Sequence, residues 1–260
     1  MRFPYLLTAL LVAVPTVLHA ADHLSGRPSL ENSDLVYDQP AASPDAGQPI
    51  GNGRMGTMVW TSPDAVHLQI NRVDVFAVNR DHRGRPGQRG SATDYCGGIA
   101  GIVVHAGGEP FAPGGRPFRQ RLSLDNAECA IEAEGLQVRC FVSADSDVLV
   151  MEVDDRRASP QRLKVAVSML RQPEVRAGEN IATSTFREDQ SRIVLTQRFR
   201  ERDYHNASAV AVGVAGNGAV IDQTSATSRT LVLPTAQKKQ VILISSAAVW
   251  KPERDVAAAA

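Results

Sequence analysis

Apolar and polar residues alternate along most of the chain, with apolar residues at every second position. Typical runs are AVHLQIN at 65–71, LQVRCFV at 136–142 and DVLVMEV at 147–153. A period of two places the apolar side chains on one face of a β-strand. An α/β fold would need a helix after most strands, and no long segment with the 3.6-residue helical period separates these runs. The pattern predicts an all-β chain, folded as an antiparallel sandwich or barrel.

Turn signals separate the runs, and one of them sets the register of two cysteines. Glu134-Gly135 joins AECAIEA to LQVRCFV as a two-residue hairpin turn. The hairpin places Cys129 opposite Cys140, and facing residues on paired strands lie close enough to be a disulfide candidate. Either the two cysteines form that disulfide or they are two buried free thiols.

The first residues of the chain have the pattern of an export signal. Arg2 supplies a positive start, an apolar run extends from Leu6 to Leu18, and small residues follow. Because this run is short for a membrane span, we predict a signal peptide at 1–21, cleaved after Ala20 or Ala21. An uncleaved anchor is the alternative. Export predicts a secreted or periplasmic protein with no membrane segment after cleavage.

The rest of the chain divides into three parts. Residues 22–48 are rich in Pro, Ser and Asp and predict an extended segment. Residues 49–250 contain the strand-like runs and predict a β-sandwich domain. Residues 251–260, KPERD followed by VAAAA, predict the start of a helix that is too short to be stable alone in water. We interpret this helix start as a linker to a domain that the sequence lacks.

The segment PIGNGRMGTMVW at 49–60 contains G-x-G-x-x-G, the spacing of a dinucleotide-binding loop. Such a loop follows a strand and opens a helix. Here SPDAGQPI precedes the glycines without strand character, and TMVW follows with strand character. We therefore expect the glycines to shape a tight turn, and we expect no nucleotide or other cofactor. Asn52 and Arg54 remain as polar residues of this turn that need another explanation.

The same segment, followed by VHLQINRVDVFA, resembles the N-terminal domain of glycoside hydrolase family 95, in which a P-[IL]-G-N-G-R-[LM]-G-x-M-V segment precedes LN-x-D. The related family called domain of unknown function 5703 is closer still, through DYCGG at 94–98, the run at 119–153 and RDYHNAS at 202–208. The resemblance covers residues 35–250. It implies a large antiparallel β-sandwich, a super-sandwich, that precedes a catalytic (α/α)6 barrel.

The resemblance implies an exported module of a glycoside hydrolase-like protein that acts on carbohydrate. The catalytic acid and base of family 95 lie in the barrel, so this chain alone is expected to be inactive, whereas its parent protein is expected to be a glycoside hydrolase. Asn71 matches LN-x-D, but the acid comes one position late, at Asp74. The alternative is a stand-alone carbohydrate-binding or structural β-sandwich. Trp60 and Trp250 are expected in the core, which disfavours a lectin.

Further polar side chains are candidates for contact with substrate or with a neighbouring domain. Asp94 follows a long loop, and Asp203 and His205 lie at the end of a strand, where alternate residues share a face. A third hypothesis is a small self-sufficient enzyme in which His205 is the base and Asp203 orients it. The simpler interpretation is a hydrogen-bonded loop cluster. The contact candidates are Asn52, Arg54, Asn71, Asp94, Asp203 and His205.

Composition and motifs exclude several other classes of function. The 28 basic and 28 acidic residues balance, and aromatic residues make up only 5% of the chain, so no nucleic-acid partner is expected. The six histidines are scattered, and no HExxH or CxxC motif occurs, so no metal site is expected. The chain also lacks G-x-S-x-G, so no serine-hydrolase nucleophile can be named.

Overall fold

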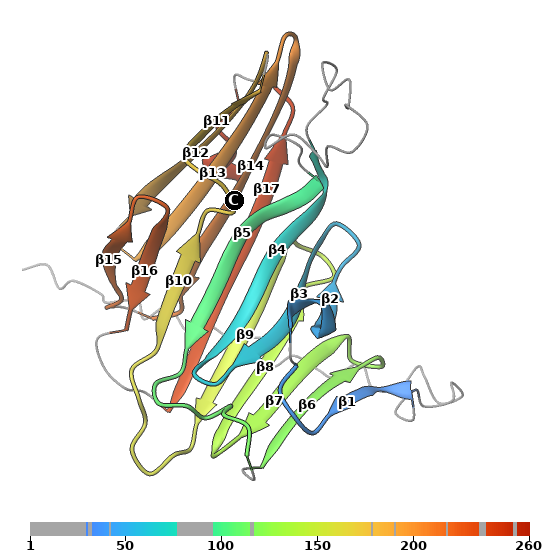
Figure 1. The fold of residues 1–260 in the computed structure, drawn as a ribbon, viewed down its shortest axis with the longest axis vertical. Coiled ribbons are helices and arrows are strands. Elements are labelled where there is room, and N and C mark those ends of the chain that lie inside the picture. The colour runs from blue at the N-terminus through green and yellow to red at the C-terminus, as the bar shows by residue number, and fades with distance from the viewer. Residues whose placement is uncertain are drawn as a thin grey trace, which may run out of the picture.

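The computed structural model shows a sandwich of two antiparallel β-sheets and one short C-terminal helix (Figure 1). The prediction of a large antiparallel β-sandwich is therefore confirmed. The signal peptide predicted at 1–21 and the candidate Asp94 lie outside the described residues. The structure describes residues 30–260 except for 31–32, 42, 77–95, 115–116, 178, 190, 217, 234–237 and 252–253.

The larger sheet has ten strands in the order β1-β6-β7-β8-β9-β17-β14-β13-β12-β11. In Figure 1 it forms the rear layer, behind β4 and β5. The strands are β1 Leu35–Tyr37, β6 Phe118–Ser123, β7 Glu128–Ala133, β8 Leu136–Val142, β9 Val148–Asp155, β11 Glu174–Ala177, β12 Asn180–Asp189, β13 Arg192–Glu201, β14 Tyr204–Val214 and β17 Lys239–Val249. Its first strand, β1, falls in the segment predicted to be merely extended, and it pairs with β6.

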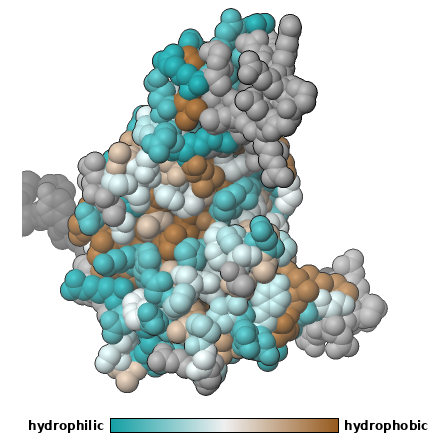
Figure 2. Space-filling view, in the orientation of Figure 1, coloured by the Kyte–Doolittle hydropathy of each residue, from teal (hydrophilic) through white to brown (hydrophobic). Residues whose placement is uncertain are grey.

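The smaller sheet has seven strands in the order β15-β16-β10-β5-β4-β3-β2. Its strands are β2 Gln48–Gly51, β3 Met55–Ser62, β4 Ala65–Phe76, β5 Cys96–His105, β10 Lys164–Ser168, β15 Val220–Ser225 and β16 Ser228–Val232. A short 3-10 helix, η2 at Pro44–Ala46, precedes β2. Figure 2 shows apolar areas between polar ones on the face of the molecule that this sheet presents to the viewer.

The core fills the space between the two sheets, and strand alternation puts it there. Along β3 the buried positions alternate with half-buried ones, from Met55 to Ser62. In the facing sheet β9 alternates in the same way, with Leu149 and Met151 fully buried. These two strands thus bury every second side chain, as the period of two predicts, whereas β13 and β14 each bury a run of consecutive residues.

The hairpin of β7 and β8 has the predicted register. Glu134 and Gly135 have φ angles of +46° and +80°, the left-handed pair of a two-residue turn. Cys129 therefore faces Cys140, and both are buried and free in this structure. Burial raises the pKa of Cys129 to about 12 and raises that of Cys140 well above its ordinary value. The register behind the disulfide candidate is confirmed, and the bond itself stays a prediction.

The glycine segment forms the turn between β2 and β3. Gly53 takes a φ of +86°, and strand β3 begins two residues later. The glycines thus shape a turn, as predicted, and the residues after them form no helix. The residues before the turn do form a strand, β2, which the sequence did not indicate. The reason is long-range: Gln48 is fully buried, and its Nε2 donates to the Leu35 carbonyl at 2.8 Å.

The C-terminal helix α1, Val256–Ala259, packs on the outer face of the ten-stranded sheet. Asp255 caps it by accepting a hydrogen bond from the Ala257 N–H at 3.0 Å. Val256 is fully buried against small residues such as Ala209. This packing explains how so short a helix is held. Within the described part of the chain, no helix combines the length and the apolar character that crossing a membrane requires.

Candidate binding site

Asn52 joins the glycine turn to the opposite sheet. Its Oδ1 accepts hydrogen bonds from the backbone N–H groups of Arg54 at 3.0 Å and Met55 at 2.9 Å, which fixes the turn. Its Nδ2 donates to the carbonyls of Ser143 at 3.0 Å and Ser146 at 3.1 Å, in the connection between β8 and β9. Because all of these partners lie within the chain, the side chain of Asn52 links the two sheets.

A buried arginine that the sequence did not single out stands beside this turn. Arg72 on β4 is only 3% exposed, and its guanidinium makes two 2.7 Å hydrogen bonds to Asp74. Its Nη1 donates to Asp147 at 2.8 Å and to the Ser246 carbonyl at 3.0 Å. Arg54, largely exposed, reaches the same Asp147 carboxylate at 3.3 Å. We call these four charged side chains the Arg72 cluster.

The charges of the Arg72 cluster balance one another. Burial acts to raise the pKa of Asp147, but hydrogen bonds from Arg72 and Asn52 outweigh it and hold that pKa below its ordinary value. Burial likewise acts to lower the pKa of Arg72, and the bonds to Asp74 and Asp147 outweigh it and raise that pKa. The cluster contains two cations and two carboxylates in mutual contact. These contacts link β4 to the facing sheet, and the balanced charges leave no excess charge to bind a ligand.

Asn71 and Arg54 line a shallow groove of about 430 Å³ beside the glycine turn. Asn71 lies on β4 opposite Gly56, and its side chain exchanges hydrogen bonds with the neighbouring Gln69. Arg72 also lines the groove, and the rest of it is formed by glycine backbone and apolar side chains, among them the exposed Val73. The structure thus brings two of the predicted contact residues to one groove, and Asn52 lies next to it as part of the turn.

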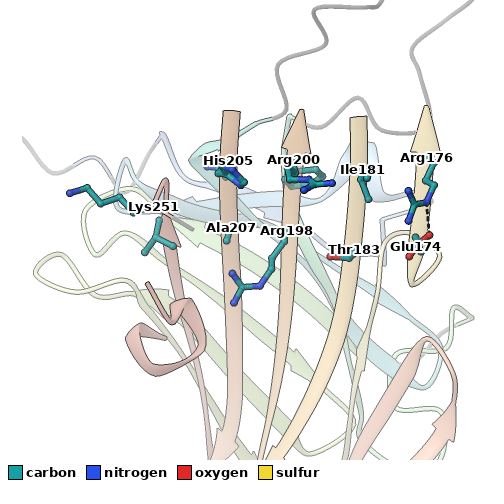
Figure 3. Close-up of a pocket in the computed structure, with 12 residues that line it drawn as sticks. Glu174, Arg176, Ile181, Thr183, Arg198, Arg200, His205, Ala207 and Lys251 are labelled. Carbon is teal, nitrogen blue, oxygen red and sulfur yellow. Dashed lines mark hydrogen bonds and ion pairs between the residues drawn. The ribbon is translucent and has the colours of Figure 1, made fainter. Parts of the chain in front are cut away.

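A second hollow, of about 420 Å³, lies over one end of the ten-stranded sheet (Figure 3). Strands β11 to β14 form its floor, and the residues after β17 close one side. Strand register aligns its side chains in two rows on the outer face of the sheet. The first row is Arg176, Ile181, Arg200 and His205, and the second is Glu174, Thr183, Arg198, Ala207 and Val249. We call this surface, together with Lys251, the basic hollow.

The basic hollow has an excess of positive charge. Its lining contains three arginines and one lysine against a single carboxylate, that of Glu174, which leaves a charge of +3 when His205 is neutral. Glu174 is already paired with Arg176 at 2.7 Å. The other cationic side chains, Arg198, Arg200 and Lys251, are exposed and form no ion pair with any residue that the structure describes.

His205 points into the basic hollow, and Asp203 does not join it there. His205 is half-buried on β14 and has no hydrogen-bond partner among the described residues. Asp203 lies in the exposed turn between β13 and β14. The base and orienting acid of the third hypothesis are therefore not assembled. The predicted candidates form two groups, one at the glycine turn and one at the β13–β14 end, and they do not converge on one centre.

The tryptophans are not core residues, contrary to expectation. Trp250 is 46% exposed because it follows the last residue of β17, where the sheet ends. Trp60 is half-buried and stacks on His67, with the ring centroids 5.4 Å apart. Near Trp250, the Tyr204 hydroxyl donates to the Phe76 carbonyl at 2.7 Å. Exposed aromatic surface therefore exists at the same end of the sheet as the basic hollow.

A serine, two histidines and an acid meet at the β3–β4 turn, a grouping that the sequence motifs did not reveal. Ser62 Oγ lies 2.8 Å from His67 Nε2 and 3.0 Å from Asp64 Oδ1. A catalytic triad places the acid on the other nitrogen of the base. Here Asp64 instead contacts His105 Nδ1 at 2.9 Å. The arrangement fits a hydrogen-bonded turn better than a serine nucleophile.

The described part of the chain contains no evident metal-binding site. No group of three or more His, Cys, Asp or Glu side chains there is placed to hold a metal ion. The acids lie instead beside arginines. Asp155, for example, binds Arg157 at 2.7 Å, and although burial acts to raise its pKa, that partner and two backbone N–H groups lower it.

Comparison with known families gives one match. Residues 35–90 match the N-terminal domain of glycosyl hydrolase family 65. The matched part contains β1 to β4 and the whole glycine turn, and it is less than half of the chain. The match supports a glycoside hydrolase-like N-terminal β-sandwich. The finer resemblance, to family 95 and to domain of unknown function 5703, stays a prediction.

Comparison with solved structures gives matches at low sequence identity. A protein described as a kojibiose phosphorylase from the human microbiome is 9% identical, with a TM-score of 0.46, and the match covers 86% of this chain and 33% of that one. A family GH92 α-mannosidase from Bacteroides thetaiotaomicron, bound to mannoimidazole, is 9% identical, with a TM-score of 0.38, covering 77% and 30%. The chain thus spans about a third of these proteins. Comparison with curated proteins found no match.

Proposed function

We propose that this chain is the exported N-terminal β-sandwich module of a glycoside hydrolase-like protein that acts on carbohydrate, and that the module supports a catalytic (α/α)6 barrel. The observation that carries the proposal is the match of residues 35–90 to the N-terminal domain of a glycosyl hydrolase family. That range includes the glycine turn, where Asn52 holds the two sheets together. The matched range therefore contains the turn that links the two sheets of the sandwich.

The chemistry of the two candidate sites supports a module that is not itself catalytic. A glycosidase uses two carboxyl groups about 5 to 10 Å apart, one of them able to donate a proton near neutral pH. In the Arg72 cluster, both carboxylates bind Arg72, and the pKa of Asp147 is lowered. The basic hollow has one carboxylate, Glu174, which is held by Arg176. Neither site offers a protonated acid opposite a free carboxylate.

A stand-alone carbohydrate-binding module is the second candidate function, and one observation favours it. Trp250 is 46% exposed at the end of the sheet that holds the basic hollow. Sugar rings stack on exposed aromatic side chains, which supply large contact area at low conformational cost. The two candidate functions differ in whether a catalytic domain accompanies this module: the first requires one, and the second does not.

The experiment that separates both of these functions from a self-sufficient enzyme is an assay of the purified chain on aryl glycosides and on disaccharides with added phosphate. We expect no turnover. The His205→Ala variant, made in parallel, reports any contaminating hydrolase, because activity from another protein is the same in both samples. Turnover that disappears in His205→Ala would overturn the proposal in favour of a self-sufficient enzyme.

Two parts of the proposal have their own tests. Export predicts that the mature protein, recovered from a bacterial periplasm, begins at Ala21 or Asp22; a full-length N-terminus would contradict cleavage. The barrel predicts that the neighbouring DNA encodes helical repeats of the (α/α)6 type. If no such coding sequence lies nearby, the stand-alone carbohydrate-binding module becomes the better interpretation.

A further inference from the structure

We propose that the basic hollow is a binding site for an anionic saccharide, one that carries carboxylate or sulfate groups. The saccharide part of this inference rests on the proposed function. The anionic part rests on the structure of the hollow itself. The cations Arg198, Arg200 and Lys251 hold the acidic groups, and the floor between them takes the sugar ring.

Arg198 and Arg200 differ from other exposed arginines of the described sheets that pair with acids on neighbouring strands. Arg139 binds Glu128 at 2.7 Å and Glu152 at 2.8 Å, and Arg192 binds Asp189 at 2.6 Å. Arg198 and Arg200 face neutral residues instead, Thr183 and Ala207 beside the first and Ile181 and His205 beside the second. Like charges brought together without counter-charges repel one another, so the arrangement favours an anionic ligand.

The side-chain chemistry suits carboxylate and sulfate groups. A guanidinium presents several N–H donors in a plane, which matches the geometry of a planar or tetrahedral oxyanion. Arg198 and Arg200 are two residues apart on one strand and project from the same face, as Figure 3 shows. Because both come from a central strand of a large sheet, their Cα positions are fixed before the ligand arrives.

The floor of the hollow suits a sugar ring. Between the cations lie the small or apolar side chains of Ile181, Thr183, Ala207 and Val249. An oligosaccharide has an apolar ring face and polar edges, so a flat apolar floor with charged walls matches an acidic sugar better than it matches a free inorganic anion. His205 adds a ring nitrogen that is not committed to any described residue.

An acidic saccharide fits better than the other polyanions. Nucleic-acid sites combine a basic groove with several aromatic side chains for base stacking, and the lining of this hollow contains one aromatic side chain, the buried Phe199. The net charge of the whole chain is zero, so no general attraction to polyanions is expected. An acidic protein surface is the remaining competitor, and the test below includes it as an outcome.

The test is calorimetric titration of the full chain at low salt with five probes: hexagalacturonate, a chondroitin sulfate hexasaccharide, neutral maltohexaose, tripolyphosphate and hexaglutamate, an acidic peptide. The variant Arg198→Gln/Arg200→Gln removes two cations of the hollow. The matched control Arg119→Gln/Arg162→Gln removes two exposed cations elsewhere, with the same change in net charge. Circular dichroism checks that every variant is folded.

We expect the chain to bind at least one acidic hexasaccharide, and the hollow variant to weaken that binding by at least about tenfold, since charge-assisted hydrogen bonds are lost. The control should stay within about twofold, the change that a general loss of charge produces at this salt. The variant Arg198→Lys/Arg200→Lys should recover part of the affinity, because it keeps the charge without the guanidinium plane.

Three outcomes would overturn the inference. The first is no binding of either acidic hexasaccharide, or equal binding by the hollow variant. The second is tripolyphosphate bound as tightly as the saccharides, which would indicate a general anion site. The third is hexaglutamate bound more tightly than either acidic hexasaccharide, which would indicate an acidic protein partner. If maltohexaose binds equally to all variants while neither acidic hexasaccharide binds, the carbohydrate function is preserved and only the hollow is rejected, so the two proposals fail separately.

Discussion

The Arg72 cluster and the basic hollow both contain arginines, yet they are built in opposite ways. Arg72 is 3% exposed and touches two carboxylates and a backbone carbonyl. Arg198 and Arg200 are exposed and form no ion pair with any described residue. Burying an unpaired charge is very costly, so a cation inside the sandwich must carry its own counter-charges.

The comparison teaches where to look for function in a sandwich of this kind. A balanced, buried cluster serves the fold, because each of its charges already has a partner. An unbalanced, exposed cluster adds nothing to stability and even reduces it by repulsion, so its presence points to a ligand. The predictions below test that separation, from the largest expected effect to the smallest.

Replacing the central arginine should have the largest effect on folding. Arg72→Met leaves Asp74 and Asp147 without their cation, and it should lower the free energy of unfolding by about 3 to 5 kcal/mol, because a broken buried pair leaves uncompensated charge. Urea denaturation measures the change. Arg54→Met is the matched control: it removes a 64% exposed partner of the same Asp147 and should cost less than about 1 kcal/mol. Equal costs would mean that burial does not distinguish the two arginines.

Replacing Asn52, which joins the glycine turn to the opposite sheet, should have the second-largest effect on stability. Asn52→Ala deletes two hydrogen bonds to the turn and three to the β8–β9 connection. We expect a loss of about 2 kcal/mol in the free energy of unfolding, since several donors and acceptors lose partners at once. Asn52→Asp keeps the acceptor but places a negative charge beside Asp147, so it should be at least as destabilising at pH 7. A cost below about 0.5 kcal/mol for Asn52→Ala would show that the turn does not depend on the side chain of Asn52 for its stability.

The pH dependence of stability should report the Arg72 cluster. The folded pKa of Asp147 lies below its unfolded value of about 3.9, so its contribution is fully present above that value and is lost as the pH falls through the folded pKa. Asp147→Asn should cost about 1 to 2 kcal/mol at pH 7, and the gap to wild type should close as the pH falls below about 4. Urea titrations at several pH values measure it, with the exposed Asp145→Asn as control. A gap that does not change with pH would contradict the ion-pair account.

The smallest effect is expected at a glycine. Gly53 has a φ of +86°, and nothing lies within 4 Å of a Cβ added there. Gly53→Ala should therefore cost only the strain of the left-handed backbone, about 1 kcal/mol. Gly51→Ala should cost more, because its Cβ would lie 2.8 Å from the Met55 carbonyl oxygen. Thermal unfolding ranks the two, and the reverse order would contradict the turn geometry.

Local patterns predicted the parts of the fold that depend on neighbours in the sequence. Alternation predicted the strands, and the two-residue turn at Glu134-Gly135 predicted the register of Cys129 and Cys140. Strand β2 escaped prediction because the burial of Gln48 depends on Leu35 and on residues of another sheet. The exposure of Trp250 was not predicted because the end of β17 is set by the sheet and not by the local sequence.

The sites were harder to predict than the fold, for the same physical reason. Arg72 was missed because its partners Asp147 and Ser246 lie 75 and 174 positions away. Sequence spacing placed Asp203 and His205 on one face, but Asp203 belongs to a turn, where the alternation of a strand ends. One available signal was overlooked: Arg198 and Arg200 in RFRER alternate along a strand, which already predicts two cations on one face.

The most direct test of the account is the free energy of unfolding of Arg198→Gln/Arg200→Gln, measured by urea denaturation without ligand. If the cations of the basic hollow serve a ligand, their removal should leave stability within about 0.5 kcal/mol of wild type or raise it slightly, because repulsion is relieved. A loss of more than about 1.5 kcal/mol would show that these arginines hold the sheet together, as Arg72 does, and would contradict the separation between the two regions.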